Sequence, residues 1–264
     1  MRIVTYNFLR AGSLKRCGHW SRVIRSLKPD LLLAQECRPP ETSPGERFRH
    51  GQRDGFAWQS AGTRDWGSGL FARSASLVPI AIPDYDGWVV GGQIRNTLWL
   101  ERPFIVFSVH GPAGERGYIR TMQHILDRIA ALRGRADLVL GGDFNIAVGY
   151  RQPRDRIRML RGERDILDRL TNEFELVSCW QAANPDRPLA QTLRWTGNPS
   201  APYHCDGIFV PRSWLPLLIS CRVVRGSRWK QLSDHNPVVA EFREEQQRIH
   251  VNEVSGWSRG GPRE

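Results

Sequence analysis

Short apolar runs recur along the whole chain, and several of them end in a polar side chain. The runs at residues 2–6 and 31–35 predict two strands. Between them apolar residues recur at helical spacing, at Trp20, Val23, Ile24 and Leu27. Pro29 and Asp30 end this helix. The chain is therefore expected to begin with a strand, a helix and a second strand.

The same pattern continues downstream. Apolar runs predict strands at 70–72, 77–82, 94–100, 104–109 and 138–140, and near Leu176, Ile208, Val223 and Val238. The clearest amphipathic helix spans 118–132, and a second one spans 163–170. Residues 39–65 are polar and rich in Gly, Pro and Arg, which predicts a surface loop. Strands that alternate with helices indicate an α/β fold.

Length and composition favour one catalytic domain. The chain has 264 residues, of which 40% are hydrophobic, enough for one substantial core and too few for two ordinary domains with linkers. We expect this domain to span residues 1–243. Residues 244–264 lose the apolar periodicity and predict a flexible tail of unassigned function.

The charge changes the picture of the partner. The formal net charge is +11, and among the 38 basic residues only Lys15, Lys28 and Lys230 are lysines. Arginine contacts phosphate in a bidentate way, so the excess fits a polyanion such as nucleic acid. A genome that writes Arg at any solvated position explains the same count. No obligate protein partner is evident.

Cysteine usage and the absence of long apolar runs indicate a compartment. The five cysteines are far apart and have no CxxC spacing, which argues against a disulfide framework or a zinc site. No run approaches the roughly 20 apolar residues of a membrane span, and the amino terminus has no signal-peptide stretch. We expect a soluble cytoplasmic protein with no membrane partner.

Candidate chemistry lies where predicted strands end. Glu36 and Asn7 each follow an apolar run, and both carry oxygen atoms that Mg²⁺ accepts as ligands. In the segment GGDFN, Asp143 and Asn145 share one face of an extended chain. In SDHNPV, Asp234 and His235 would point to opposite sides if the chain is extended, and Asp206 can orient the imidazole of His235. Each residue alone is more often structural, and only their joint occurrence favours a site.

The ordered segments TYN, QE, GDFN, DGIFV and SDHNPV resemble those of the endonuclease/exonuclease/phosphatase superfamily, from residue 1 to about residue 243. The resemblance implies a four-layer sandwich of two packed mixed β-sheets flanked by helices. It also implies a hydrolase of phosphate esters that depends on Mg²⁺ or Mn²⁺, with one or two ions. A nuclease acting on DNA or RNA is the expected activity. The alternatives are a phosphatase or phosphodiesterase for a small substrate, and a relative that binds nucleic acid without cleaving it.

The resemblance also assigns roles. Asn7, Glu36 and Asp234 would be metal ligands, and Asp143 and Asn145 would align the water and the phosphate. His235 paired with Asp206 would be the general base, and His110 would stabilise the phosphate or assist the leaving group. Arg38 would contact the substrate, as would Asn145.

Departures from the family pattern concern the branch. His110-Gly111-Pro112 stands where abasic-site enzymes carry a tyrosine and an asparagine, which leans away from abasic-site repair. An acidic partner for His110 is expected near Trp66, where Asp65 is close. Trp66 and Trp88 are candidates for base stacking, although packing is the commoner role. Tyr203, His204 and the arginines at 151, 154, 156 and 158 border the motifs without an assigned function.

Overall fold

The computed structural model describes residues 1–10, 18–43, 45–97, 102–115, 117–152, 155 and 157–243. The predicted tail at 244–264 lies outside these residues, as do Cys17, Arg154 and Arg156. Four cysteines, Cys37, Cys179, Cys205 and Cys221, are buried and reduced, as expected. Among the described helices, none has the length and apolar character that crossing a bilayer requires.

The first sheet is built around a parallel pair of strands. β1 and β2 are parallel because α1 connects them across the face of the sheet, and the other pairs are antiparallel. The strand order is β11-β12-β1-β2-β4-β3. These strands are β1 (Arg2–Asn7), β2 (Leu31–Cys37), β3 (Gly55–Ser60), β4 (Gly67–Ala72), β11 (Leu218–Val223) and β12 (Val238–Phe242).

The second sheet repeats this plan. Its parallel pair, β7 and β8, is joined by the helix α2, and the strand order is β5-β6-β7-β8-β10-β9. These strands are β5 (Ser76–Ile80), β6 (Val89–Arg95), β7 (Phe104–His110), β8 (Asp137–Asp143), β9 (Leu176–Ser178) and β10 (Asp206–Pro211). The helices are α1 (His19–Leu27), α2 (Gly117–Arg133), α3 (Arg161–Asn172), α4 (Cys179–Ala183) and α5 (Ser227–Leu232), with 3₁₀ turns η1 (Pro40–Thr42) and η2 (Arg212–Leu217).

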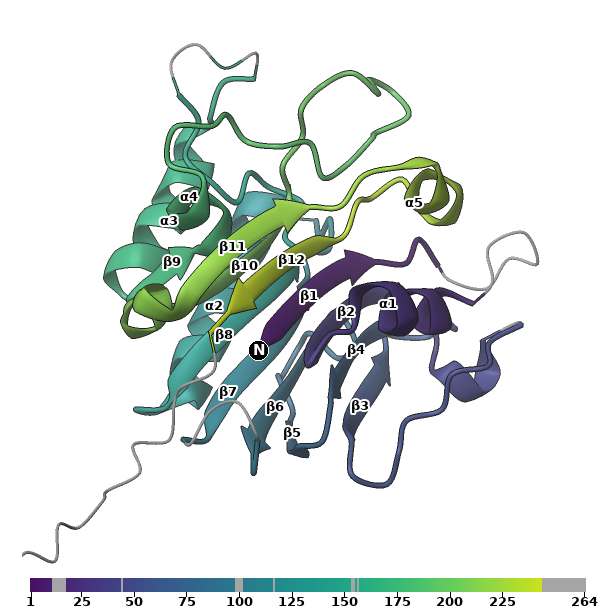
Figure 1. Ribbon diagram of the computed structural model, residues 1–264. Helices are drawn as coiled ribbons and strands as arrows, with labels where there is room; N and C mark the ends of the chain where they lie inside the picture. The colour runs from purple at the N-terminus through teal and green to yellow at the C-terminus, as the bar shows by residue number, and fades with distance from the viewer. Residues whose placement is uncertain are drawn as a thin grey trace, which may run out of the picture.

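Helices cover both outer faces, so the molecule has four layers (Figure 1). One core lies between the sheets and includes Leu33, Val106 and Ile208. A second core packs α1 and α5 against the first sheet, and a third packs α2 and α3 against the second sheet. Neighbouring residues such as Ile3 and Val4 on β1 belong to different cores, because successive side chains of a strand point to opposite faces. The predicted four-layer sandwich is confirmed.

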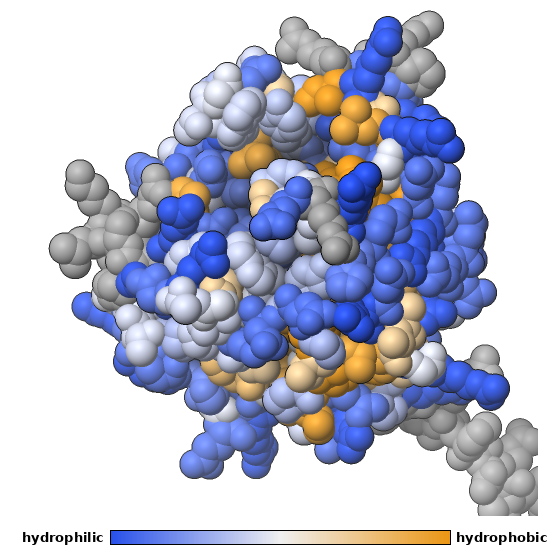
Figure 2. Space-filling model, turned by 180° about the vertical axis from the view of Figure 1, so that it is seen from behind, coloured by the Kyte–Doolittle hydropathy of each residue, from blue (hydrophilic) through white to orange (hydrophobic). Residues whose placement is uncertain are grey.

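The surface agrees with the composition. Seen from behind, it is mostly hydrophilic, with hydrophobic residues in separate patches (Figure 2). This fits a chain in which 25% of the residues are charged.

Two predictions about elements were wrong. The expected loop at 39–65 contains η1 and the edge strand β3, whose Phe56 and Trp58 pack on the first sheet's outer core. The strand expected at 94–100 is β6 at Val89–Arg95, and residues 98–100 lie outside the described part. Gly91 lies inside β6 although glycine is unusual there. A Cβ on Gly91 would stand 2.3 Å from the ring of Phe107 on β7, so only glycine fits.

We therefore expect Gly91→Ala to lower the free energy of unfolding by about 1–3 kcal/mol, the usual cost of overpacking a core. Gly92→Ala is the matched control, because its Cβ would meet only side-chain carbons of Leu77, at 3.0 Å, and of Leu70, at 3.5 Å. Denaturant unfolding of both variants measures the two costs. Equal losses would mean that the ring of Phe107 does not set the requirement for glycine.

Candidate active site

The sheets bring the polar strand ends together at one end of the sandwich. His110 ends β7 and lies in register with Asp143 at the end of β8. Asp206 begins the antiparallel strand β10 opposite Asp143. Asn7 and Glu36 stand at the carboxyl ends of β1 and β2. Residues from 7 to 235 thereby meet at the crevice that strand ends form in α/β folds.

Asn7 links the two sheets at this end. Its side-chain amide nitrogen donates to Asp143 Oδ2 at 3.0 Å and to Glu36 Oε1 at 3.3 Å. Its amide oxygen accepts the backbone N–H of Leu9 at 2.8 Å. Asn7 is fully buried, so these bonds hold two carboxylates side by side away from bulk water.

Glu36 reaches the site because β2 is irregular. Its φ is +45°, and the pairing of β2 with β4 shifts register between Ala34 and Cys37. Such a bulge re-aims a side chain. Glu36 Oε2 is buried with no hydrogen-bond partner among the described residues, and it lies 3.7 Å from Nε of Arg10. Burial raises the pKa of Glu36, and the charge of Asp143 adds to this effect.

The segment GGDFN, residues 141–145, forms the end of β8 and the turn that follows it. The φ of Gly142 is +152°, and a Cβ there would stand 1.8 Å from the carbonyl oxygen of Val109. Asp143 Oδ1 accepts the N–H of Asn145 at 3.0 Å, and the Asn145 side chain donates to the Gly111 carbonyl at 2.9 Å. Burial raises the pKa of Asp143, and the charge of His235 opposes this shift.

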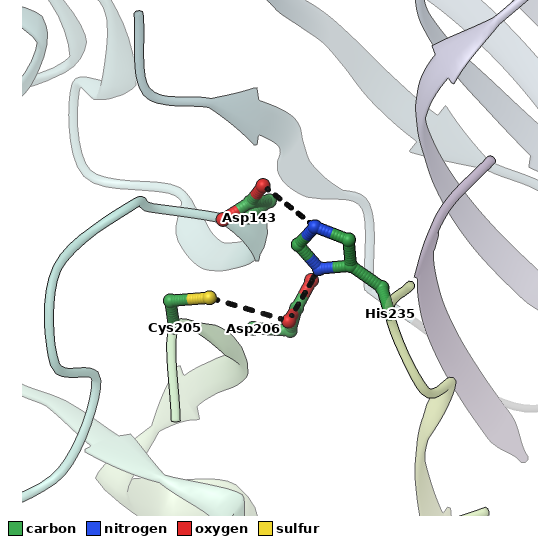
Figure 3. A group of neighbouring side chains, drawn as sticks. All are labelled: Asp143, Cys205, Asp206 and His235. Atoms are coloured by element: carbon green, nitrogen blue, oxygen red, sulfur yellow. Dashed lines mark hydrogen bonds and ion pairs between the residues drawn. The ribbon is translucent and has the colours of Figure 1, made fainter. Parts of the chain in front are cut away.

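Asp206 and His235 form the predicted pair. His235 Nδ1 lies 2.9 Å and 3.0 Å from the two carboxylate oxygens of Asp206, and both side chains are buried. Nε2, on the other side of the ring, lies 3.6 Å from Asp143 Oδ2 (Figure 3). Burial disfavours the imidazolium, but the charges of Asp206 and Asp143 outweigh it and raise the pKa of His235 to about 10.

A residue that the sequence did not single out holds this histidine in place. The guanidinium of Arg194 donates to the carbonyls of Ser233 and His235 and to the side chain of Asn236. The backbone N–H of Arg194 donates to the carbonyl of Asp234. Arginine is frequent throughout this chain, so no sequence signal distinguished this one.

The side chains of Asp234 and His235 do not point to opposite sides, as an extended chain would imply. Its Oδ1 lies 3.9 Å from His235 Nε2, so the neighbouring side chains approach each other. The Asp234 side chain is partly exposed, unlike the carboxylates of Asp143 and Asp206.

His110 packs beside two tryptophans that also contact each other. The ring centroids of Trp66 and Trp88 lie 5.9 Å and 5.0 Å from that of His110. Its Nε2 lies 3.6 Å from Glu36 Oε1, and burial lowers the pKa of His110 to about 4. Trp66 is buried and Trp88 is partly buried, so both pack against the histidine. The acid next to His110 is thus Glu36, whereas Asp65 forms an ion pair with Arg38.

A cavity of about 500 Å³ adjoins these residues. Asn145 of the site and Cys205, the neighbour of Asp206 in sequence, line this cavity together with Tyr203 and His204. Three of the most exposed large hydrophobic side chains, those of Tyr118, Leu160 and Trp195, lie on it. Arg151 and Arg158 add positive charge. Aromatic and cationic walls next to buried carboxylates can receive an anionic ligand with a ring.

The donor atoms fit a hard divalent cation. Glu36 Oε2 is an orphaned buried oxygen, and the carboxylate of Asp143 is held next to Glu36 by Asn7. Oxygen donors of this kind suit Mg²⁺ or Mn²⁺. Ligand atoms of Asp143, Cys205, Asp206 and His235 also lie within 4.8 Å of one another. Within that group the Cys205 thiol donates to Asp206 and burial raises its pKa well above the usual value, so it is a poor thiolate ligand.

Comparison with known proteins identifies the family of the chain. The profile of the Endonuclease/Exonuclease/phosphatase family matches residues 16–235. The chain belongs to this family. No curated protein matches the chain in sequence at a significant level.

Several solved structures share the fold. A 3' phosphatase from Neisseria, NExo, bound to a product DNA hairpin, is 18% identical with a TM-score of 0.65, and the match covers 92% of this chain and 99% of that one. The catalytic domain of Xenopus laevis APE2 is 16% identical with a TM-score of 0.66 and 94% coverage of both chains. An AP endonuclease from Archaeoglobus fulgidus is 17% identical with a TM-score of 0.63, covering 92% and 99%. At these identities the likeness establishes the fold, and the branch of the family stays a prediction.

The buried imidazole of His204 makes the stability of the fold depend on pH in the acid range. It is buried, Nδ1 lies 2.6 Å from the Ala190 carbonyl, and burial lowers its pKa to about 4. The unfolded chain takes up this proton near pH 6.5 and the folded chain only near pH 4, so stability is full above pH 6.5 and falls as the pH drops between these values. The loss is on the order of 3 kcal/mol.

We expect His204→Asn to reduce the dependence of unfolding free energy on pH in this window, to which the lowered pKa of His110 also contributes, even if the variant is less stable at every pH. His50→Asn, at an exposed position, is the control for loss of an imidazole. Urea unfolding at a series of pH values measures both. An unaltered slope in His204→Asn would show that another group takes up the proton.

Proposed function

We propose that the protein is a metal-dependent phosphodiesterase, most specifically a nuclease acting on DNA or RNA. One observation carries the proposal: Nε2 of His235, backed by the carboxylate of Asp206, lies 3.6 Å from the buried carboxylate of Asp143, which shares the side-chain amide of Asn7 with Glu36. A base beside carboxylates that can hold a cation is the combination that phosphodiester hydrolysis requires.

The residues divide the work as follows. Glu36, Asp143 and Asp234 would hold Mg²⁺ or Mn²⁺, with Asn7 fixing the first two and offering the second lone pair of its oxygen. The cation, when bound, supplies positive charge that offsets the negative charge of the phosphate. His235 Nε2 takes the proton of the attacking water, and Asp206 stabilises the imidazolium that results. Asn145 contacts the phosphate, and Asp143 orients the water.

His110 has a separate role. Burial keeps it neutral at pH 7, so it can donate one N–H without carrying a charge. Its ring packs against Trp66 and Trp88, and its Nε2 lies next to Glu36. From this position it can bind a phosphate oxygen or the leaving group. Arg38 is already paired with Asp65, so its contact with substrate would compete with that pair.

The protonation of His235 depends on its neighbours. In the chain alone, the surrounding carboxylates keep the imidazole charged. A cation on these carboxylates would oppose the proton, so that His235 can be neutral and act as a base. The carboxylates that stabilise the imidazolium of His235 include those that would hold the cation. A positive charge next to an imidazolium disfavours the protonated form.

Nucleic acid is the favoured substrate class. The net charge of +11 attracts a polyanion, and the cavity beside Asn145 has aromatic walls and two arginines. Its volume of about 500 Å³ also fits a small phosphate ester, which is the second candidate. The chain keeps every residue that the proposed hydrolysis uses, which argues against a relative that only binds.

His235→Ala and Asp206→Asn should each lower turnover by about a hundredfold to ten-thousandfold, because each removes general-base catalysis. The assay uses plasmid DNA, single-stranded DNA, RNA and bis-nitrophenyl phosphate, with Mg²⁺, Mn²⁺ or chelator. His50→Ala is the control for loss of a histidine, and the melting temperature checks folding. Near wild-type activity in His235→Ala would exclude it as the base, and cleavage of the small ester alone would favour the second candidate.

Glu36→Gln should raise the Mg²⁺ concentration needed for half-maximal activity and also lower the maximal rate, because it removes a charged oxygen ligand while keeping the shape. Glu41→Gln, at an exposed glutamate of η1, is the matched control. Titration of activity with Mg²⁺ and calorimetric titration of the metal measure the effect. An unchanged metal affinity would remove Glu36 from the set of ligands.

A further inference from the structure

A second basic feature lies outside the candidate active site, on the side of the molecule that α1 and α5 cover. Four arginines, Arg22, Arg25, Arg47 and Arg228, surround a hollow of about 460 Å³. Gly18, Ser21, Ser26 and Gly45 complete its lining. We call it the arginine hollow. None of these lining residues is acidic.

The four guanidinium groups form no ion pair with any of the described residues, and all four residues are exposed. Some other arginines of the described part do form ion pairs, as Arg2 does with Glu241 and Arg128 with Asp84. Like charges that share one hollow repel each other, and a bound anion relieves the repulsion.

The nearby acid serves a different purpose. Glu46 lies between two lining residues in sequence, but its side chain is buried. Glu46 Oε1 accepts the N–H groups of Ser21, Arg47 and Phe48 at 2.8–3.1 Å, and the Ser21 hydroxyl as well. Glu46 therefore satisfies the start of α1, and among the described residues its carboxylate forms no ion pair with the four arginines of the hollow.

The arginine hollow is built on elements that are tied to the candidate site. α1 follows β1, whose end carries Asn7. His19, at the start of α1, lies 3.0 Å through Nε2 from the carbonyl of Leu232, directly before the segment of Asp234 and His235. Arg228 on α5 contacts Ser26 on α1 at 3.4 Å, and the two helices lie on the same side in Figure 1. Arg25 lies about 10 Å further along α1 than Gly18, in the direction away from the strand ends that carry the candidate site.

From this geometry we infer that the arginine hollow binds backbone phosphates of a nucleic acid whose cleaved bond lies in the candidate active site. Guanidinium groups match phosphate oxygens in a bidentate way. The inference rests on the proposed function, and it adds a second anchoring point for substrates long enough to reach around the rim. Short substrates would not reach it.

The test compares two double variants that remove the same charge. The variant Arg25→Ser/Arg228→Ser removes two of the four arginines of the hollow. The control Arg135→Ser/Arg212→Ser removes two exposed arginines beside the start of β8 and the end of β10, at the end of the sandwich away from the candidate active site. Neither pair belongs to the proposed catalytic machinery. Binding of duplex DNA of about 8 and about 40 base pairs is measured by fluorescence anisotropy over a range of salt, with Ca²⁺ present to limit cleavage.

The hollow variant should bind the long duplex about tenfold to a hundredfold more weakly at low salt, and its slope of log affinity against log salt should shrink by about 1–2. Its affinity for the short duplex and its turnover of bis-nitrophenyl phosphate should equal those of the wild type. The control variant should stay close to wild type in every measurement. The melting temperatures of both variants verify the fold.

Three results would overturn the inference alone. They are equal losses in both variants, which indicate general charge attraction; an equal loss on the short duplex, which places these arginines within the footprint of the active site; and no loss on the long duplex. A wild-type protein that binds neither duplex and cleaves no nucleic acid would overturn the inference together with the nuclease proposal. Turnover of the small ester then tells whether the phosphoesterase site itself is sound.

Discussion

The contact between Asn7 of one sheet and Asp143 of the other is the constraint on which the site depends. It joins residues 136 positions apart, at the seam where the two sheets meet. A second contact beneath it, from Gln35 to Ser108, fixes the same seam inside the core. A buried polar group needs a partner, so these bonds restrict how the sheets can slide against each other. The distances between Glu36, Asp143 and His235 follow from that restriction.

Burial then turns this geometry into reactivity. Acids held in a dry crevice resist ionisation, and an imidazole surrounded by acids retains its proton. The same crevice thus contains carboxylates with raised pKa values and a histidine with a raised pKa. His110, a few ångströms away but facing tryptophans, shows the opposite shift. Two histidines of one site are therefore set apart by what each one faces, and this separation is what acid–base chemistry uses.

The sequence predicted the sandwich and the closeness of the candidate site residues, because strand ends carry a local signal and the resemblance supplied their order. Glu36, Asp143, Asp206 and His235 all lie together as expected. Features that depend on a distant partner were not predictable. The glycine at position 91 needed the ring of Phe107, β3 was hidden in a polar stretch, and the contacts of Arg194 with the loop around His235 join residues some forty positions apart. The expected opposite orientation of Asp234 and His235 was wrong because the chain bends at Asp234, which brings Asp234 Oδ1 within 3.9 Å of His235 Nε2.

The left-handed backbone of Glu36 has a consequence for the stability of the protein. A residue other than glycine costs about 1–2 kcal/mol in that conformation, and here the residue also carries a buried, unsatisfied oxygen. A glycine at this position would relax both strains and would remove the carboxylate. Selection for folding alone would therefore not keep a glutamate there. A strained backbone together with a buried, unsatisfied oxygen in a crevice of polar side chains points to a function for that side chain, so the conformation of Glu36 is a reason for testing this residue that is independent of its place in a motif.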